Sequence, residues 1–374
     1  MAVEWQQFFR QVRGKLAGAW GRHPLVLAKG EAALRGRLTL ADVAPLVDSG
    51  LLPAGCAALG AGARDWRSVP LSGPLAEVLP SATAYANNAG LYLSTLAEVC
   101  LAAVQVLGWP TTCNAYLSGS GLAVSVPPHT DRQDVLVLQT SGRKRWTVFA
   151  PPAVGPVDPL RRGKDGDAML EAELGEHLMD VTLSAGDALY VPLGFPHSTS
   201  TLLGGAGADE EPSVHITLNL DSLIWGLSYR MLWIVALRRA RLRRGMSDPP
   251  EEGRGTEGMT WQRYAALQAP LPLGFVEEEA AGACVQGLAG DLSRRVADWT
   301  GGEVPQSEEL GEGDVEAALA MLLEHRGTLL ELHRHMYLDV LLDLSKAPPL
   351  EREMGHWQLL QEQMGVLRRS MGWE

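Results

Sequence analysis

The chain has 374 residues and a formal net charge of −12, and 46% of its residues are hydrophobic while 20% are charged. Such a composition is typical of a globular protein with a large buried core. The acidic balance argues against a broad nucleic-acid-binding face, which needs a surplus of basic residues.

The first 110 residues combine helical and extended patterns. Residues 4–20 predict an amphipathic helix, and residues 23–27 predict a strand entered through a proline. Thr39 is a typical N-cap for a helix that begins at the next residue. A further helix is predicted at 93–107, before a glycine that favours a helix C-terminus.

From residue 112 to residue 220 the pattern becomes β. We expect strands at 114–118, 134–139, 143–149 and 213–220, with a turn at 140–142 that returns the third strand as the partner of the second. Several short strands joined by turns are typical of an antiparallel sandwich or barrel rather than a parallel α/β sheet.

Two histidines and one carboxylate stand in two separate parts of this β region. His129 and Asp131 are two residues apart, so on a strand their side chains point to the same side. His197 follows a tight turn at 186–187, a strand at 188–192 and a Gly-Phe-Pro loop that delivers it to a fixed place. The pair alone also fits a turn or an ion pair. With His197, the set predicts a site that binds one face of Fe(II) and leaves the other face open.

Lys144 lies in the strand predicted at 143–149, where alternation puts it on the same face as Trp146 and Val148. A lysine on an apolar, barrel-facing surface is costly unless a negative group pairs with it. We therefore interpret Lys144 as a candidate for binding a carboxylate. The alternative is that it is one of three adjacent basic residues in a solvated hairpin.

Two other strands carry polar side chains on one face. Asn114 and Tyr116 share a face of the first strand, and Thr217 and Asn219 share a face of the last strand with His215. By pattern alone, Asn114 also fits a turn and Tyr116 a core position. We interpret His215 as a hydrogen-bonded core histidine rather than as a fourth metal ligand.

The last part of the chain changes character. Helical patterns are predicted at 225–244, 261–267, 275–299, 314–345 and 350–371, with an exposed link at 247–258. Residues 225–235 are too apolar for a lone exposed helix, which predicts a homodimer through the C-terminal helices. The histidines of the 314–345 run, His325, His333 and His335, are expected at the surface or at an interface.

No segment has the features of a membrane anchor or a secretory signal. The longest apolar run, 223–237, is short and interrupted by Arg230, and no basic segment followed by an apolar core begins the chain. The four cysteines lack metal-ligand spacing. We therefore expect a cytoplasmic or nuclear protein with free thiols, no membrane partner and no nucleic-acid partner.

Taken in order, these segments resemble the cupin-fold JmjC-type oxygenases, nearest the ribosomal oxygenase branch, over roughly residues 4–221. The residues that carry the resemblance are Trp20 with 23–27, then 114–118, 128–131, 134–139, 142–146, and 186–187 leading to 196–197. The resemblance implies a mainly β fold with added α-helices. Its core would be a double-stranded β-helix (cupin or jelly-roll) barrel at 111–222, between an N-terminal mixed α/β part at 1–110 and a helical region at 223–374.

The resemblance also implies an Fe(II)- and 2-oxoglutarate-dependent dioxygenase that uses O2 as a second co-substrate. The iron ligands would be His129, Asp131 and His197, and Lys144 would bind the far carboxylate of 2-oxoglutarate. The further candidate co-substrate-binding residues, at or near family pocket positions or on the same strand face, are Asn114, Tyr116, Asn219 and Thr217.

Three alternatives for function follow. The ribosomal branch hydroxylates protein side chains, and an acidic enzyme attracts a basic ribosomal or histone segment. The family's winged helix has no counterpart in the helices predicted at 223–374, so a small molecule or free amino acid is an alternative substrate. The third alternative is a non-catalytic metal-binding cupin scaffold. Lys144, Tyr116 and Asn114 argue against a scaffold, because a structural metal site has no use for a carboxylate clamp.

Overall fold

The structure is a computed structural model that describes residues 2–59, 66–151, 163, 167–203, 211–246, 260–273, 281–302, 310–343 and 349–370. The chain divides into two compact units. Unit 1 comprises Met1–Pro152, Asp158–Leu220 and His333–Met354, and unit 2 comprises Ala153–Val157, Asp221–Leu332 and Gly355–Glu374. The division into 1–110, 111–222 and 223–374 stays a prediction.

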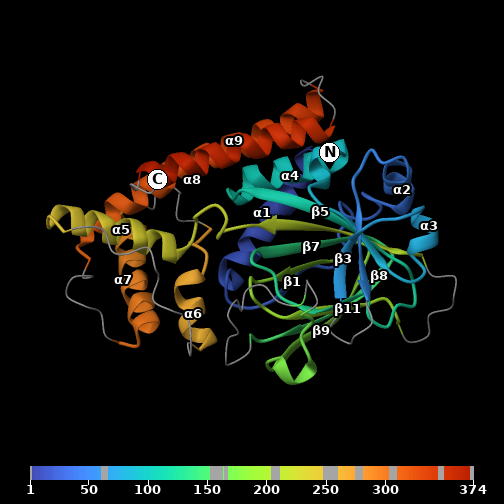
Figure 1. Ribbon diagram of the computed structural model, residues 1–374, viewed down its shortest axis with the longest axis horizontal. Helices are drawn as coiled ribbons and strands as arrows, with labels where there is room; N and C mark the ends of the chain where they lie inside the picture. The colour runs from blue at the N-terminus through green and yellow to red at the C-terminus, as the bar shows by residue number, and fades with distance from the viewer. Residues whose placement is uncertain are drawn as a thin grey trace. The chain divides into compact units, whose positions relative to one another are not determined.

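Unit 1 contains all the described strands (Figure 1). Its helices and 3-10 turns are α1 (Ala2–Ala19), α2 (Leu40–Asp48), α3 (Leu75–Val78), η1 (Ala89–Leu91), α4 (Ser94–Leu107) and η2 (Glu171–Glu173). Its strands are β1 (Leu25–Ala28), β2 (Gly55–Leu59), β3 (Trp66–Pro70), β4 (Thr83–Ala86), β5 (Thr111–Ser118), β6 (Val126–His129), β7 (Asp134–Ser141), β8 (Arg143–Phe149), β9 (His177–Ser184), β10 (Ala188–Val191), β11 (His197–Ser200) and β12 (Ser213–Leu220).

The strands form two antiparallel sheets. The larger has the order β1-β10-β7-β12-β5-β4-β2-β3, and the smaller has the order β6-β11-β8-β9. The sheets face each other across one apolar core, which is built from Val135, Val137, Trp146, Val148, Leu183, Leu189 and Val191. The sequence predicts helices together with antiparallel sheets, and the structure contains both. Within the described residues no ladder of hydrogen bonds joins the two sheets, so they are facing layers and not a continuous ring.

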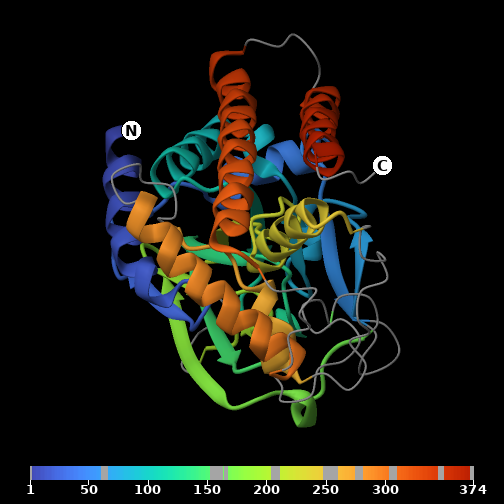
Figure 2. The same cartoon turned by 90° about the vertical axis from the view of Figure 1, so that its left-hand side faces the viewer.

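Two long helices cover part of the larger sheet. The helices α1 and α4 pack against each other (Figure 2), and they contact β1 and β5. The helix α4 ends at Gly108, whose φ of 62° is a left-handed conformation that favours glycine. At the start of α2, the Asp42 carboxylate accepts the Thr39 backbone N–H at 2.8 Å, so Thr39 is the N-cap that the sequence predicts.

The prediction that the strand at 143–149 pairs with the strand before it is wrong. The strand β7 pairs with β10 and β12 in the larger sheet, whereas β8 pairs with β9 and β11 in the smaller one. Gly142 makes the corner between the sheets with a φ of 61°, and a Cβ at this position would lie 2.5 Å from the Pro212 carbonyl oxygen. A larger residue at Gly142 would therefore hinder the passage of the chain from one sheet to the other. The sequence correctly predicts a turn at 140–142, but this turn joins two sheets and does not form a hairpin.

The strand expected to carry both His129 and Asp131 also needs correction. His129 is the last residue of β6, so Asp131 lies beyond the strand rather than along it. His197 follows the predicted loop and is the first residue of β11, where it is paired in register with His129. These strands have only four residues each, which is too short for a pattern of alternation to reveal them.

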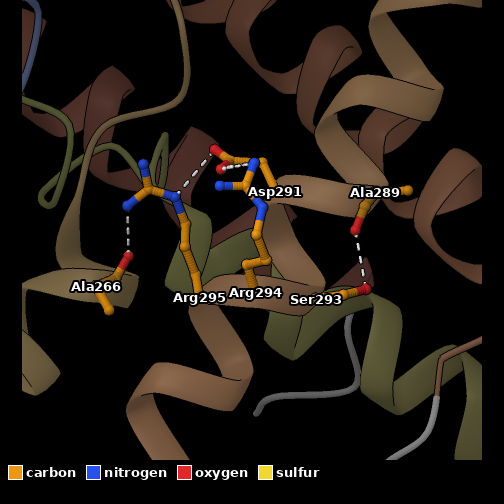
Figure 3. A network of polar contacts seen from close by, with 6 residues as sticks. All are labelled: Ala266, Ala289, Asp291, Ser293, Arg294 and Arg295. Carbon is orange, nitrogen blue, oxygen red and sulfur yellow. Dashed lines mark hydrogen bonds and ion pairs between the residues drawn. The ribbon is translucent and has the colours of Figure 1, made fainter.

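The described part of unit 2 is helical. It contains α5 (Tyr229–Arg243), α6 (Trp261–Gln268) and α7 (Ala281–Thr300), and it shares α8 (Glu312–Leu342) and α9 (Pro349–Ser370) with unit 1. Figure 3 shows Arg295 of α7 donating from Nε to Asp291 at 3.1 Å and from Nη1 to the Ala266 carbonyl at 2.8 Å, which ties α7 to α6. The link predicted at 247–258 lies outside the described residues.

The apolar segment of the C-terminal region is buried inside the chain. Trp225, Leu227, Leu232 and Val235 are each at most 4% exposed. Met231 and Ile234 of the same segment are half-buried, and the homodimer stays a prediction. His325 and His333 are 4% and 0% exposed, so the surface placement expected for them is wrong, whereas His335 is exposed. None of the described helices is long and apolar enough to cross a membrane.

Candidate metal centre and adjoining pocket

The side chains of His129, Asp131 and His197 come together at the paired ends of β6 and β11. One ligand atom from each lies within 4.8 Å of the other two, and the His197 Nε2 is 3.5 Å from Asp131 Oδ2. Ligands about 2.1 Å from a common octahedral ion lie about 3 Å apart, so a small contraction brings these atoms onto one metal. In the part of the chain that the structure describes, this is the group found with metal-ligand geometry.

The hydrogen bonds of the two imidazoles fix their tautomer. The Nδ1 of His129 lies 2.8 Å from the Pro127 carbonyl, and the Nδ1 of His197 lies 3.0 Å from the Phe195 carbonyl. A carbonyl only accepts, so each Nδ1 carries the proton and each Nε2 keeps its lone pair for a metal. Trp146 stacks on His197 with ring centroids 5.8 Å apart and limits the rotation of that ring.

Gly163 lies against the backbone of His129. A Cβ at this position would lie 2.5 Å from the Pro128 carbonyl oxygen and 2.8 Å from the His129 Cβ, and its own φ is 83°. Only glycine fits such a close approach in this conformation. Gly163 itself therefore lies directly against the end of β6, from which the first candidate ligand extends.

Lys144 is fully buried on the inner face of β8, as the alternation with Trp146 and Val148 predicts. Its Nζ donates to the Ser118 Oγ at 2.7 Å. Within the described residues no carboxylate pairs with it, and burial lowers its pKa from 10.5 to about 7. The neighbouring Arg145, on the outer face, is exposed and pairs with Asp180. The solvated-hairpin alternative therefore fits Arg145 and not Lys144.

Hydroxyl groups orient the lysine. The Thr83 Oγ1 donates to the Ser125 carbonyl at 2.8 Å, which leaves the Thr83 oxygen to accept from the Ser118 hydroxyl at 2.8 Å. The lone pairs of the Ser118 oxygen then accept a hydrogen bond from the Lys144 ammonium, which has donors and no acceptor. The sequence marked Ser118 only by its alternation with Asn114 and Tyr116, and nothing in the sequence marks Thr83 of β4.

Lys144 and the three candidate ligands line one cavity. The residues that surround it are Tyr116, Val126, His129, Asp131, Val135, Lys144, Trp146, His197, Thr199, His215 and Thr217. Lys144 and the three candidate metal ligands thus lie in the wall of one small chamber. A metal at one end and an ammonium at the other suit a dianion with two separated carboxylates.

The remaining predicted pocket residues divide into two groups. Tyr116 and Thr217 line the cavity, whereas Asn114 and Asn219 are not in its wall. The Asn114 Oδ1 accepts the Asn88 N–H at 3.2 Å. Asn219 donates to Thr112 Oγ1 and accepts from Gln133, both at 3.3 Å. Both asparagines thus bond neighbouring protein groups.

His215 is not the hydrogen-bonded core histidine that the sequence suggested. It is 2% exposed, and its buried Nδ1 has no hydrogen-bond partner among the described residues. It stacks on Tyr116 with ring centroids 5.0 Å apart and an interplanar angle of 3°. Burial and the nearby Lys144 charge hold the pKa of His215 well below its ordinary value. The ring is therefore neutral near pH 7.

The buried charge of Lys144 generates a prediction about stability. Lys144→Met should raise the free energy of unfolding by on the order of 1–4 kcal/mol near pH 7, because the burden of a buried ammonium disappears while Ser118 keeps Thr83 as a partner. In the wild type, a pKa lowered by folding makes stability rise between pH 7 and 10.5, so the advantage of the variant should shrink over this range. Urea unfolding at several pH values measures both effects.

The matched control is Arg145→Met, on the exposed face of the same strand, which should change stability by less than about 1 kcal/mol. A Lys144→Met protein that is clearly less stable than this control would mean that the lysine holds the fold together.

Comparisons with known proteins agree with this geometry. Residues 94–220 match the family model described as the JmjC domain. The bifunctional lysine-specific demethylase and histidyl-hydroxylase NO66 of Drosophila simulans is 33% identical over 165 residues, which cover 42% of this chain and 18% of that protein. The same protein of Drosophila melanogaster is 32% identical over 165 residues, or 42% and 24% of the two chains. The alignment thus spans about a fifth of these relatives.

Solved structures resemble the fold more distantly. The X-ray structure of Escherichia coli ycfD has 18% sequence identity and a TM-score of 0.44, and the match covers 78% of this chain and 68% of that chain. A structure of YcfD, a ribosomal oxygenase, in complex with cobalt and 2-oxoglutarate has 17% identity and a TM-score of 0.42, with 77% and 69% covered. The family model and the NO66 alignments carry the assignment: residues 94–220 of this chain match the JmjC domain.

Proposed function

We propose that this chain is an Fe(II)- and 2-oxoglutarate-dependent hydroxylase that acts on a protein side chain. The observation that carries the proposal is the single cavity that has three convergent metal-ligand side chains at one end and the buried Lys144 at the other. A structural metal site needs no cation in the same cavity, which disfavours a non-catalytic scaffold.

The donor set fits iron. His129, Asp131 and His197 supply two neutral nitrogens and one carboxylate, and this set leaves three coordination positions for co-substrates. Bound iron would supply the oxidation, in which O2 and 2-oxoglutarate yield succinate, CO2 and a hydroxylated substrate carbon. The backbone carbonyls behind the two imidazoles hold the donor nitrogens toward the cavity.

The protein's own contribution is binding, orientation and exclusion of water. Lys144 would bind the far carboxylate of 2-oxoglutarate, with Ser118 holding the ammonium in place. Tyr116 and Thr217 lie in the wall of the same cavity and would contact the carbon chain or its oxygens. Trp146 packs over His197 and keeps that side of the site apolar.

The proposed substrate is a basic ribosomal or histone segment. The relatives that match are named as a lysine-specific demethylase and histidyl-hydroxylase, and an acidic chain with a net charge of −12 attracts basic partners. A homodimer through the C-terminal helices is also proposed. Apolar side chains of α9 that remain exposed and would contribute to it are Leu350, Met354, Leu359 and Val366.

A metal-binding prediction tests the ligands. Replacing His129 or Asp131 by alanine should weaken the binding of Co(II) or Fe(II) by at least about a hundredfold, because a three-residue site loses one ligand and its charge or lone pair. Anaerobic calorimetry measures the dissociation constant. His177→Ala, an exposed histidine of β9, is the control and should bind metal as the wild type does. Unchanged affinity in both ligand variants would remove the proposed site.

A pH prediction tests Lys144. An empty-pocket pKa of about 7 means that the ammonium is lost as the pH rises, so the dissociation constant of 2-oxoglutarate should increase about tenfold per pH unit above 7. The neighbouring His215 stays neutral throughout and adds no change of charge. Calorimetry with the Mn(II)-loaded protein under nitrogen gives the profile. With 2-oxopentanoate, which has a methyl group in place of the far carboxylate, the profile should be flat.

A substrate experiment separates the two substrate classes. Succinate release is measured with Fe(II), 2-oxoglutarate and ascorbate against basic ribosomal and histone peptides and, in parallel, against pools of amino acids and metabolites. The proposal expects stimulation by one or more peptides and a mass increase of one oxygen on a side chain. Stimulation by metabolites alone would favour the small-molecule alternative, and no turnover with any mixture would favour the scaffold.

A further inference from the structure

His215 is a buried polar group to which the proposed function assigns no role. It lies on β12 in the wall of the cavity that also contains Lys144 and the three candidate ligands. The side chain is 2% exposed, yet its Nδ1 has no hydrogen-bond partner within the described residues. A buried polar atom without a partner is unfavourable, and at this position it decides which of the two ring nitrogens carries the proton.

Three other histidines of the described residues bond backbone carbonyls. His129 and His197 bond backbone carbonyls through Nδ1, and His325 bonds the Trp225 carbonyl through Nε2 at 2.9 Å. The Nδ1 of His215 makes no such contact within the described residues, and His215 is set apart from these three by its place in the cavity wall beside Lys144.

Aromatic neighbours hold the ring in one orientation. Tyr116 of β5 stacks face to face on it, and Trp146 of β8 meets it edge-on with centroids 5.5 Å apart and an angle of 78°. These rings come from both sheets, so the imidazole is clamped between them. A donor held this firmly binds a ligand without a large loss of side-chain entropy.

The charge state of the ring decides what it can offer. The neighbouring ammonium of Lys144 and the apolar surroundings keep His215 neutral, with one N–H and one lone pair. Buried N–H groups without an acceptor are rarer than buried acceptors without a donor. The favoured tautomer therefore has the lone pair on the enclosed Nδ1 and the proton on Nε2, toward the cavity.

We propose that His215 is a co-substrate-binding residue whose Nε2–H donates to the carboxylate that Lys144 holds. A carboxylate has about four lone-pair sites, and a lysine already bonded to Ser118 uses only part of them. A neutral second donor adds a hydrogen bond without a second buried charge. This inference rests on the proposed function, because it takes 2-oxoglutarate as the ligand.

The test is a cycle of two proteins and two ligands. The full chain, loaded with Mn(II) under nitrogen, is titrated with 2-oxoglutarate and with 2-oxopentanoate. His215→Phe keeps the aromatic stacking and removes both nitrogens. It should raise the dissociation constant of 2-oxoglutarate about tenfold to a hundredfold and leave that of 2-oxopentanoate within about twofold of the wild type. The affinity for Mn(II) should not change.

Equal loss of affinity for both ligands would overturn the inference, because it would indicate a general effect on packing. Equal affinity of the wild type and His215→Phe for 2-oxoglutarate would overturn it as well. If the wild type itself binds no 2-oxoglutarate, the proposed function fails, and this outcome is distinct from the other two. His215→Gln, which keeps an N–H donor of similar reach, should recover part of the affinity that His215→Phe loses.

A measurement on the wild type does not depend on any variant. In the Zn(II)-loaded protein labelled with 15N-histidine, 2-oxoglutarate should produce one new slowly exchanging imidazole N–H signal, because a hydrogen-bonded proton is protected from water. 2-Oxopentanoate should not produce this signal. The same spectrum with both ligands would contradict a contact between His215 and the far carboxylate.

Discussion

A buried ammonium without a buried counter-charge is the constraint around which this site is organised. Lys144 is fully buried, its acceptor is the neutral Ser118 hydroxyl, and its pKa falls to about 7. Such a group weakens the fold, and a protein retains it where a negatively charged ligand provides the missing counter-charge. The metal held by His129, Asp131 and His197 would make the second contact with that bound molecule, and the chamber that contains both contacts limits how large the molecule can be.

The two sheets are what bring these ends together. The candidate ligands stand on the paired strands β6 and β11 of the smaller sheet, and Lys144 stands on β8 of the same sheet, next to β11. The larger sheet supplies Ser118, Tyr116 and His215 from β5 and β12. The Gly142 corner that sends β8 into the smaller sheet is therefore a condition for the site, because it turns the lysine toward the ligands and toward its hydroxyl partner.

Much of this arrangement could be predicted from the sequence, for physical reasons that differ between elements. The strands at 143–149 and 213–220 were predicted at the bounds that the structure shows, because long alternating runs carry a strong signal. The alternation of side chains along one strand placed Lys144 on the same face as Trp146, and this inference needed no knowledge of the fold. The three metal-ligand residues were predicted from their chemical types.

What the sequence could not reveal depends on contacts between distant segments. The assignment of β7 and β8 to different sheets follows from their pairing with strands that are distant in the sequence, and the role of Thr83 follows from its hydrogen bond with Ser118 between β4 and β5. The absence of a partner for His215 is a property of the packed interior. Residues 225–235 illustrate the reverse case, since their apolar pattern predicted a partner chain while the chain itself covers most of them.

The central claim is that a metal at His129, Asp131 and His197 and a dicarboxylate at Lys144 occupy the chamber together. Anaerobic absorption spectroscopy of the Fe(II)-loaded chain tests this most directly. Addition of 2-oxoglutarate should produce a weak visible charge-transfer band in the wild type, and succinate, which lacks the keto oxygen for chelation, should not. A chain that binds Fe(II) tightly yet gives no such band at saturating 2-oxoglutarate would contradict the account.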